Sequence, residues 1–195
     1  HPDYAIALQN LAAVYQKTGE LDSALMLYES ALDIDRSFYG EQSLAFAAKT
    51  ANLGAVHQDI GNYSKALAFY ERALQIRKAK LSPDHPDYAF NLYSIGFLLY
   101  RTGQSQKALP YFREMATLYL RQIRDVFPVL SDYERTAFYN KIHPVIQGYE
   151  LFMVENARTN PSLAGELLNF RLETKALLLN ASIKVRNQIL RSEDP

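Results

Sequence analysis

The sequence contains no cysteine, and glycine and proline are scarce, with eight of each among 195 residues. The absence of cysteine excludes disulfides, thiolate metal sites and cysteine nucleophiles within the chain. The scarcity of helix-breaking residues, together with abundant Ala, Leu, Gln, Lys and Glu, favours helix over sheet. The sequence therefore predicts an all-α fold without covalent cross-links.

The chain also lacks an excess of charge of either sign. Lysine plus arginine and aspartate plus glutamate number 21 each. This balance argues against nucleic acid or a membrane as a partner, because anionic partners select a clear cationic excess. No apolar run approaches the length of a membrane span, and no basic-then-apolar leader opens the sequence. We expect a soluble, cytoplasmic protein, and 48% hydrophobic residues suffice for a continuous core.

One stretch, HPDYA, occurs twice, at residues 1–5 and 85–89. The separation of 84 residues resolves into two steps of 42, and 14 of the 42 positions are identical between the first two steps. That is too many identities for shared helicity alone to explain. The predicted repeat units are residues 1–42, 43–84 and 85–126.

Each unit is predicted to be a pair of helices. In the first helix, apolar or small residues recur three and four positions apart, at Leu8, Leu11, Ala12 and Tyr15. A glycine such as Gly19 then ends the helix, where a left-handed residue is needed. In HPDYA, Pro2 suits the first helical position and Asp3 its first turn, so His1 would precede the helix.

The recurring residues resemble a known repeat signature. Small residues that let helices approach closely recur in register, as do alanine and aromatic positions: Ala12, Gly54 and Gly96; Ala24, Ala66 and Ala108; Tyr28, Tyr70 and Phe112. This pattern resembles the tetratricopeptide repeat (TPR), and the 42-residue period resembles its kinesin-light-chain type. The resemblance implies a right-handed α-solenoid of three TPR hairpins over residues 1–126. His57 stands at an aromatic core position, so we expect a packed, hydrogen-bonded histidine there rather than a metal ligand.

The resemblance also assigns a concave groove, lined by the first helix of each hairpin. Asn10 and Asn52 occupy the position where kinesin-light-chain-like repeats carry an asparagine, whose carboxamide can pair with a peptide backbone. The third unit adds four aromatic residues and Arg101, a combination typical of binding hot spots. The predicted peptide-binding residues are Gln9, Asn10, Gln16, Asn52, Gln58, Phe90, Tyr93, Phe97, Tyr100 and Arg101.

Structural roles are the alternative for these residues: Phe90 and Phe97 would pack beneath the neighbouring helix or the tail, and the asparagines would bridge adjacent helices. A carboxylate clamp of the chaperone-cochaperone type is excluded, because only Asn52 matches it; the other positions hold Gln9, Ala13, Phe90 and Ser94. The four histidines lack ligand spacing and no phosphate-binding glycine loop occurs. We therefore predict no metal, no cofactor and no catalytic activity in this chain.

Beyond residue 126 the repeat register is lost, but helix signals continue. SDYE at 131–134 is a capping box, and a helix is predicted to about Asn156, with a kink or break at Pro144. A second long helix follows TNPS, with an apolar stripe at Leu163, Leu167, Phe170, Leu177, Ala181, Val185 and Ile189. These helices, within residues 127–195, are expected to cover the open end of the solenoid.

The tail resembles a second known segment. LSDYERTAF, and a later run with Arg171, Lys175, Leu177–Leu179 and Ser182, are similar to the helical stretch that joins TPR arrays to a CHAT domain, a caspase-like peptidase of bacterial TPR proteins. The resemblance implies a regulatory part of a larger bacterial protein, with the peptidase after residue 195. A free-standing scaffold or cargo adaptor that docks short linear motifs is the alternative.

The HPDYA start indicates that the chain begins at a repeat edge. We therefore expect a piece of a longer solenoid whose first helix is exposed, and exposed end helices could pair between copies to form a homodimer. A protein or peptide is the expected partner.

Overall fold

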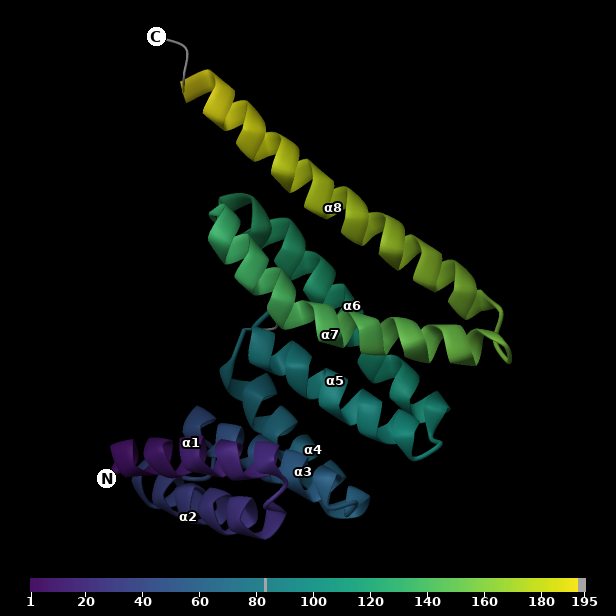
Figure 1. Ribbon diagram of the computed structural model, residues 1–195. Helices are drawn as coiled ribbons and strands as arrows, with labels where there is room; N and C mark the ends of the chain where they lie inside the picture. Colours follow the sequence, from purple (N-terminus) through teal and green to yellow (C-terminus); the bar gives the residue numbers. More distant parts are fainter. Residues whose placement is uncertain (83, 193–195) are drawn as a thin grey trace. The chain divides into compact units, whose positions relative to one another are not determined.

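The computed structural model describes residues 1–82 and 84–192, and the side chains of these except at 132 and 180–192. Within this part every regular element is a helix, which confirms the predicted all-α class (Figure 1). The chain forms two compact units, His1–Gln104 and a second from Ser105 onward. The boundary between them falls inside the third predicted repeat, and the division at residue 126 stays a prediction.

The described residues of the first unit form five helices. They are α1 (Pro2–Thr18), α2 (Leu21–Tyr39), α3 (Leu44–Asp59), α4 (Tyr63–Lys80) and α5 (Pro86–Arg101). Each packs against the next along the chain. The starts of α1, α3 and α5 follow the 42-residue step, so the repeat seen in the sequence is a repeat of helices.

The helix ends form as the sequence predicts. The Nδ1 atoms of His1 and His85 accept hydrogen bonds from the backbone N–H groups of Asp3 and Asp87, at 3.3 and 3.1 Å. A proline follows each histidine at the start of the helix. Gly19, Gly61 and Gly103, which follow α1, α3 and α5, have φ values of 86°, 87° and 78°. This left-handed region suits glycine because a Cβ atom is disfavoured there.

Small residues allow the paired helices to approach closely. Ala12 and Ala66 have no exposed surface. A Cβ atom added to Gly54 of α3 would lie 2.8 Å from two ring carbons of Tyr70 in α4. Tyr70 is itself 5% exposed, so its ring has little freedom to move away. The glycine at 54 is thus required by the α3–α4 contact.

We expect Gly54→Ala to destabilise the protein by about 1–3 kcal/mol, the usual cost of overpacking a filled core. Gly165→Ala is the matched control. Gly165 also lies in a helix, but its added Cβ would meet nothing within 4 Å, so we expect a gain of up to about 1 kcal/mol from helix propensity. Urea denaturation followed by circular dichroism measures both. Equal effects would contradict the close approach at Gly54.

Equivalent positions on α1, α3 and α5 differ in how deeply they are buried. Leu11, predicted to be on the buried stripe of α1, is 46% exposed, whereas Leu53 and Ile95 at the equivalent positions are 1% and 0% exposed. The difference arises because α2 covers this side of α3 and α4 covers this side of α5, whereas in the described part of the first unit no helix covers it on α1. The prediction for Leu11 was therefore wrong, and that of an exposed face on the first helix is confirmed.

The α2–α3 and α4–α5 contacts carry polar pairs at equivalent positions. Asp35 and Lys49 form a buried ion pair, with 3.3 Å between Oδ2 and Nζ. One 42-residue step later, Arg77 donates a hydrogen bond to the Asn91 carboxamide oxygen at 3.0 Å, and Asn91 donates to the backbone oxygen of Tyr70. The first pair is neutral overall, whereas the second pairs a cation with an uncharged group.

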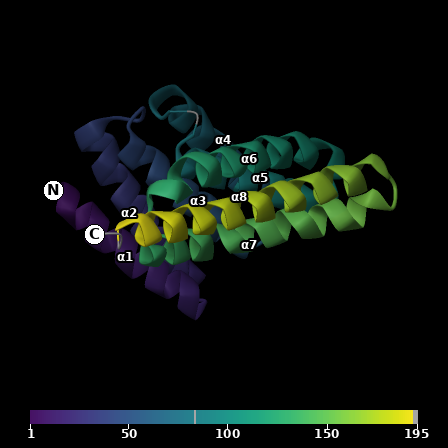
Figure 2. The ribbon, with the colours of Figure 1, turned by 90° about the horizontal axis from the view of Figure 1, so that it is seen from above.

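The second unit contains α6 (Ser105–Val126), a short 3₁₀ helix η1 (Phe127–Val129), α7 (Asp132–Ala157) and α8 (Ser162–Ser192). Figures 1 and 2 show α6, α7 and α8 running side by side. The capping box forms, since Ser131 and Glu134 exchange side chain–backbone hydrogen bonds. No break occurs at Pro144, because Val145 and Ile146 are buried and packing holds α7 through the proline.

Aromatic rings form the centre of the second unit. The rings of Phe112 and Phe152 lie 4.5 Å apart, and those of Tyr149 and Phe170 lie 4.9 Å apart, measured between centroids. Ion pairs between Arg113 and Glu166 and between Arg124 and Glu173 join α6 to α8. The predicted stripe of α8 is buried at Leu163, Leu167 and Phe170 and half-buried at Leu177; Ala181, Val185 and Ile189 lie outside the side chains described. That this unit covers the end of the solenoid stays a prediction.

Candidate binding groove

A cavity of about 410 Å³ lies among α3, α4 and α5. Five of the ten predicted site residues line it: Asn52, Gln58, Phe90, Tyr93 and Phe97. Small residues of α3, Ala51 and Ala55, form part of the same lining and leave room between the helices. Residues that the repeat register assigned to one site thus lie together in the structure, although some, such as Asn52 and Phe97, are 45 positions apart in the sequence.

The aromatic residues form a continuous row along α5. The ring centroids of Phe90 and Tyr93 are 6.3 Å apart, and those of Tyr93 and Phe97 are stacked at 5.7 Å. Tyr100 continues the row in an edge contact with Phe97 at 6.4 Å. Phe90 is 54% exposed, so it is not packed beneath a neighbouring helix. Aromatic faces placed in this way can receive an apolar or planar group of a ligand.

Arg101 extends the row beyond the first cavity. Its guanidinium carbon lies 5.9 Å from the centroid of the Phe97 ring, within cation–π range. Together with Gln58, Asp59, Tyr63 and Phe97 it lines a second cavity of about 220 Å³. Gln58 and Phe97 belong to both cavities, so the two form adjoining parts of one groove.

Gln16 and Gln58 are partly engaged in structural contacts. Tyr28 donates to the Gln16 side chain and Tyr70 to the Gln58 side chain, each at 3.4 Å and each across twelve residues. Gln16 also donates to Asp59 at 2.6 Å, which links the ends of α1 and α3. Burial, followed by the negative charge of Asp59, raises the pKa of the Tyr70 phenol, which therefore stays a hydrogen-bond donor at neutral pH.

Like Tyr70 and Asn91, Arg77 lines this groove but is absent from the predicted site. It lies on α4, in a second helix of a repeat, whereas only first helices were assigned to the groove. Its side chain is 8% exposed and lines the cavity, where it contacts the neutral Asn91. Burial lowers the pKa of the Arg77 guanidinium, and the negative charge of Asp87 offsets part of this shift. The sequence carries a signal for this residue, because position 77 holds an arginine where the equivalent position of the preceding repeat, position 35, holds an aspartate.

The four other predicted residues do not line these cavities. Asn10 is exposed and Gln9 is half-buried on α1. Neither they nor Gln16 and Tyr100 line the two cavities of the first unit. The structure therefore concentrates the candidate site on α3, α4 and α5.

His57 occupies the packed position that its register predicts. Its ring stacks on Phe69 with 5.3 Å between centroids and 6° between planes. Burial, followed by the charge of Lys65, lowers the pKa of its imidazole, so the ring is neutral at pH 7. Its Nδ1 atom has no hydrogen-bond partner among the residues described, so the expected hydrogen bond is missing at this atom.

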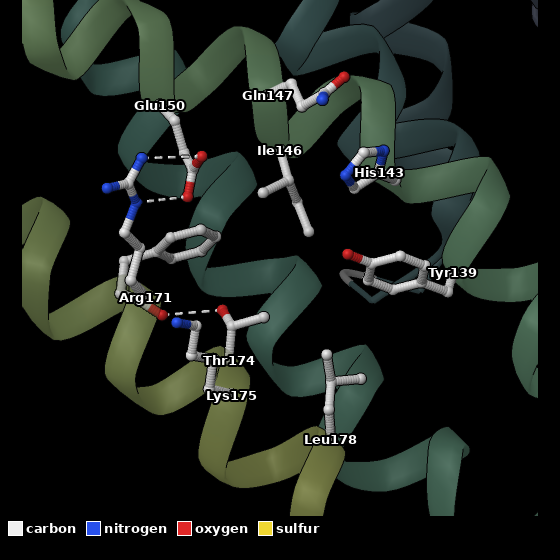
Figure 3. A pocket seen from close by; sticks show the side chains of 10 residues that line it. Tyr139, His143, Ile146, Gln147, Glu150, Arg171, Thr174, Lys175 and Leu178 are labelled. Carbon is white, nitrogen blue, oxygen red and sulfur yellow. Dashed lines mark hydrogen bonds and ion pairs between the residues drawn. The ribbon is translucent and has the colours of Figure 1, made fainter.

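The second unit has a cavity of its own. About 300 Å³ in volume, it lies between α7 and α8, and Figure 3 shows Tyr139, His143 and Ile146 directed toward it from α7. Arg171 closes one side by two hydrogen bonds to Glu150, at 2.7 and 3.1 Å. Arg171 and Glu150 neutralise each other, and the rest of the lining combines polar residues such as Gln147 and Lys175 with the apolar Ile146, Phe170 and Leu178.

The described residues contain no cluster of three or more metal-ligating His, Cys, Asp or Glu side chains. No helix in the part of the chain that the structure describes is both long and apolar enough to span a membrane.

The family model for the tetratricopeptide repeat matches residues 1–37 and 45–121. The chain belongs to the tetratricopeptide repeat family. Such repeats generally form protein–protein interaction modules. A search of curated proteins returned no match.

Solved structures with the same fold confirm the TPR architecture. A Podosopora anserina protein, described as a kinesin light chain with nearly identical TPR-like repeats, matches with a TM-score of 0.59 and 16% identity, covering 100% of this chain and 99% of that one. BtubC (BKLC) from P. vanneervenii matches with a TM-score of 0.64 and 16% identity, covering 100% and 68%. The apo form of RapI matches with a TM-score of 0.54 and 18% identity, covering 96% and 72%. At these identities the likeness concerns the fold alone.

Proposed function

We propose that this TPR protein binds an extended peptide segment of a partner protein in the groove formed by α3, α4 and α5. The row of aromatic rings from Phe90 to Tyr100 is the observation that carries the proposal. This row, in which Phe90 is exposed and the other three rings are half-buried, lies beside a cavity and provides apolar contact area at low entropic cost. Asn52, on the opposite wall, supplies a donor and an acceptor for a peptide backbone.

Arg77 gives the groove a preference for ligand groups that accept hydrogen bonds. A guanidinium carries five N–H donors, and the described structure gives Arg77 one side-chain partner, the neutral Asn91. A ligand group that accepts hydrogen bonds would satisfy further donors inside the cavity. We therefore expect peptides with an acceptor side chain, carboxylate or carboxamide, to be preferred beside an apolar residue.

Selection from a phage-displayed library of random peptides tests the proposal. Selected peptides should compete with one another and should lose about 30-fold in affinity for Phe90→Ala, because truncating a hot-spot residue costs about 2 kcal/mol. Asn52→Ala should weaken binding of all selected peptides alike, since it would contact the backbone. Fluorescence anisotropy with labelled peptides gives the dissociation constants.

Met26→Ala is the matched control, because Met26 is a large apolar residue of the same unit, 69% exposed on α2 and absent from both cavities. Its affinity should equal that of the wild type. If Phe90→Ala and Asn52→Ala also bind the selected peptides with wild-type affinity, peptide binding in this groove is refuted.

We further propose that the module regulates a CHAT-type, caspase-like peptidase in a bacterial protein. The similarity of the α7 start and of the α8 run around Arg171 and Lys175 to the helical stretch before such domains supports this context. A partner in the groove would then bias the attached enzyme. The coding sequence downstream of residue 195 tests the idea: a domain with a histidine and a cysteine after strands supports it, and any other continuation refutes it.

A free-standing scaffold or cargo adaptor is the second candidate. The aromatic groove alone favours it, since docking a short linear motif needs no attached enzyme. Micromolar affinity for the selected peptides, about −8 kcal/mol, would be ordinary for such a role. Retrieval of the same partner by the isolated chain and by the full coding product would favour it, whereas dependence on an attached domain would contradict it.

A further inference from the structure

The cavity between α7 and α8 combines apolar side chains with hydrogen-bond donors. Both of its walls belong to described residues of the second unit, within residues 139–150 of α7 and 170–178 of α8. Thr174 is small, and its hydroxyl donates to the backbone oxygen of Phe170 in its own helix at 2.8 Å, so this side chain fills little of the space between the helices. The volume of about 300 Å³ lies at the lower end of the range for small-molecule sites.

The apolar part of the lining suits an aromatic ligand body. Ile146 of α7 and Phe170 of α8 are 8% and 6% exposed, and the half-buried Leu178 also lines the cavity. Tyr139 and His143 add two rings whose centroids lie 5.1 Å apart, and Figure 3 shows both directed toward the cavity. Rings pack on one another in stacked or edge contacts. An aromatic ligand would therefore meet ring partners as well as apolar surface.

The polar part of the lining favours an anion. Glu150 is the one acidic residue among the lining residues, and Arg171 already donates two hydrogen bonds to it, at 2.7 and 3.1 Å. Lys175 makes no ion pair or hydrogen bond with another described residue, and the same holds for the side-chain hydrogen bonds of Tyr139 and Gln147. A ligand carboxylate would accept hydrogen bonds from these three groups and would supply the negative charge that Lys175 lacks.

We propose that this cavity is a binding site for a small aromatic carboxylate, with its ring among Ile146, Phe170 and Leu178 and its carboxylate at Lys175. The inference goes beyond peptide binding in the groove of the first unit and does not depend on it. Because both helices contribute to the site, a ligand would bind only when α7 and α8 are packed together. Binding would therefore stabilise the second unit against unfolding.

Titration of the isotope-labelled protein with phenylpropionate, followed by two-dimensional amide NMR, tests the proposal. Signals of residues 139–150 and 170–178 should shift, with a dissociation constant of about 1 mM, which is ordinary for a fragment of this size. Phenylpropionamide is the neutral counterpart of this probe. It should bind about twofold to fivefold more weakly, because it cannot form an ion pair with Lys175.

Two variants locate the site. Lys175→Met should weaken phenylpropionate binding by the same factor of about two to five and leave phenylpropionamide binding unchanged. Gln147→Trp should weaken the binding of both compounds at least about tenfold, because the indole would fill the cavity from an exposed position without removing core atoms.

Lys141→Met is the matched control, because Lys141 is an exposed lysine of α7 that does not line the cavity. This variant should bind phenylpropionate with wild-type affinity. Circular dichroism confirms that each variant keeps its helix content.

Four outcomes would overturn the proposal. The first is an absence of shifts in α7 and α8 at about ten times the expected dissociation constant, where a site of this affinity is about 90% occupied. The second is equal affinity of the wild type for the acid and the amide, and the third is wild-type affinity in Gln147→Trp. The fourth is a set of shifts confined to α3, α4 and α5 and lost in Phe90→Ala, since the carboxylate would then occupy the groove of the first unit.

Discussion

Replacement of Asp35 by alanine is expected to lower the free energy of unfolding by about 3–5 kcal/mol, because it leaves the Lys49 ammonium buried without a counter-charge. The two side chains are 3% and 7% exposed, and their contact joins α2 to α3. The Asp35 Oδ2 atom makes no hydrogen bond within the described structure, so the attraction is mainly coulombic. Chemical denaturation followed by circular dichroism measures the loss.

Two companion variants separate charge burial from helix effects. Asp33→Ala removes an exposed carboxylate from the same helix, which pairs with Arg36 at 2.8 Å, and should cost at most about 1 kcal/mol. Asp35→Leu/Lys49→Met removes both buried charges and should recover most of the stability. A double variant as unstable as Asp35→Ala would show that the side-chain shapes, rather than the charges, hold α2 against α3.

Replacement of Phe152 by alanine is expected to destabilise the second unit by about 3–5 kcal/mol, the range for truncating a buried phenylalanine. The Phe152 side chain is 1% exposed and contacts Phe112 within the aromatic centre of α6, α7 and α8. Near-ultraviolet circular dichroism follows the loss of aromatic packing during thermal unfolding.

Leu151→Ala is the neighbouring control, because Leu151 is on the same helix and 50% exposed. It should cost less than about 1 kcal/mol, since half of its surface is already in water. A comparable loss in both variants would mean that Leu151 is covered in solution.

The helix boundaries and the repeat could be predicted because they depend on local signals. Gly19, Gly61 and Gly103 end their helices through backbone conformation, which is a property of the residue itself. The histidine caps and the capping box at Ser131 depend on neighbours within three residues. Register then placed Asn52 and Phe97 on facing helices, since equal spacing in a repeat gives equal position in space.

What could not be predicted depends on which helices cover which faces. Leu11 has the same residue type and spacing as Leu53, yet only Leu53 is buried, because burial requires a preceding helix. Arg77 was missed because the assignment of groove residues followed first helices alone. Its role depends on two facts that the sequence alone does not show: its hydrogen-bond partner is the uncharged Asn91, and a cavity lies beside this pair.

The paired polar residues at the hairpin contacts have a consequence for the evolution of the array. Unequal recombination between 42-residue repeats deletes or duplicates whole hairpins. Removing residues 36–77 would join Asp35 of α2 directly to residue 78, near the end of α4. Asp35 would then lie against Asn91, as a buried carboxylate with no cation beside it. Duplicating residues 43–84 would bring Arg77 of one copy against Lys49 of the next. Each contact thus accepts its own neighbour and penalises the other, so the polar pairs preserve the order in which structurally similar hairpins follow one another.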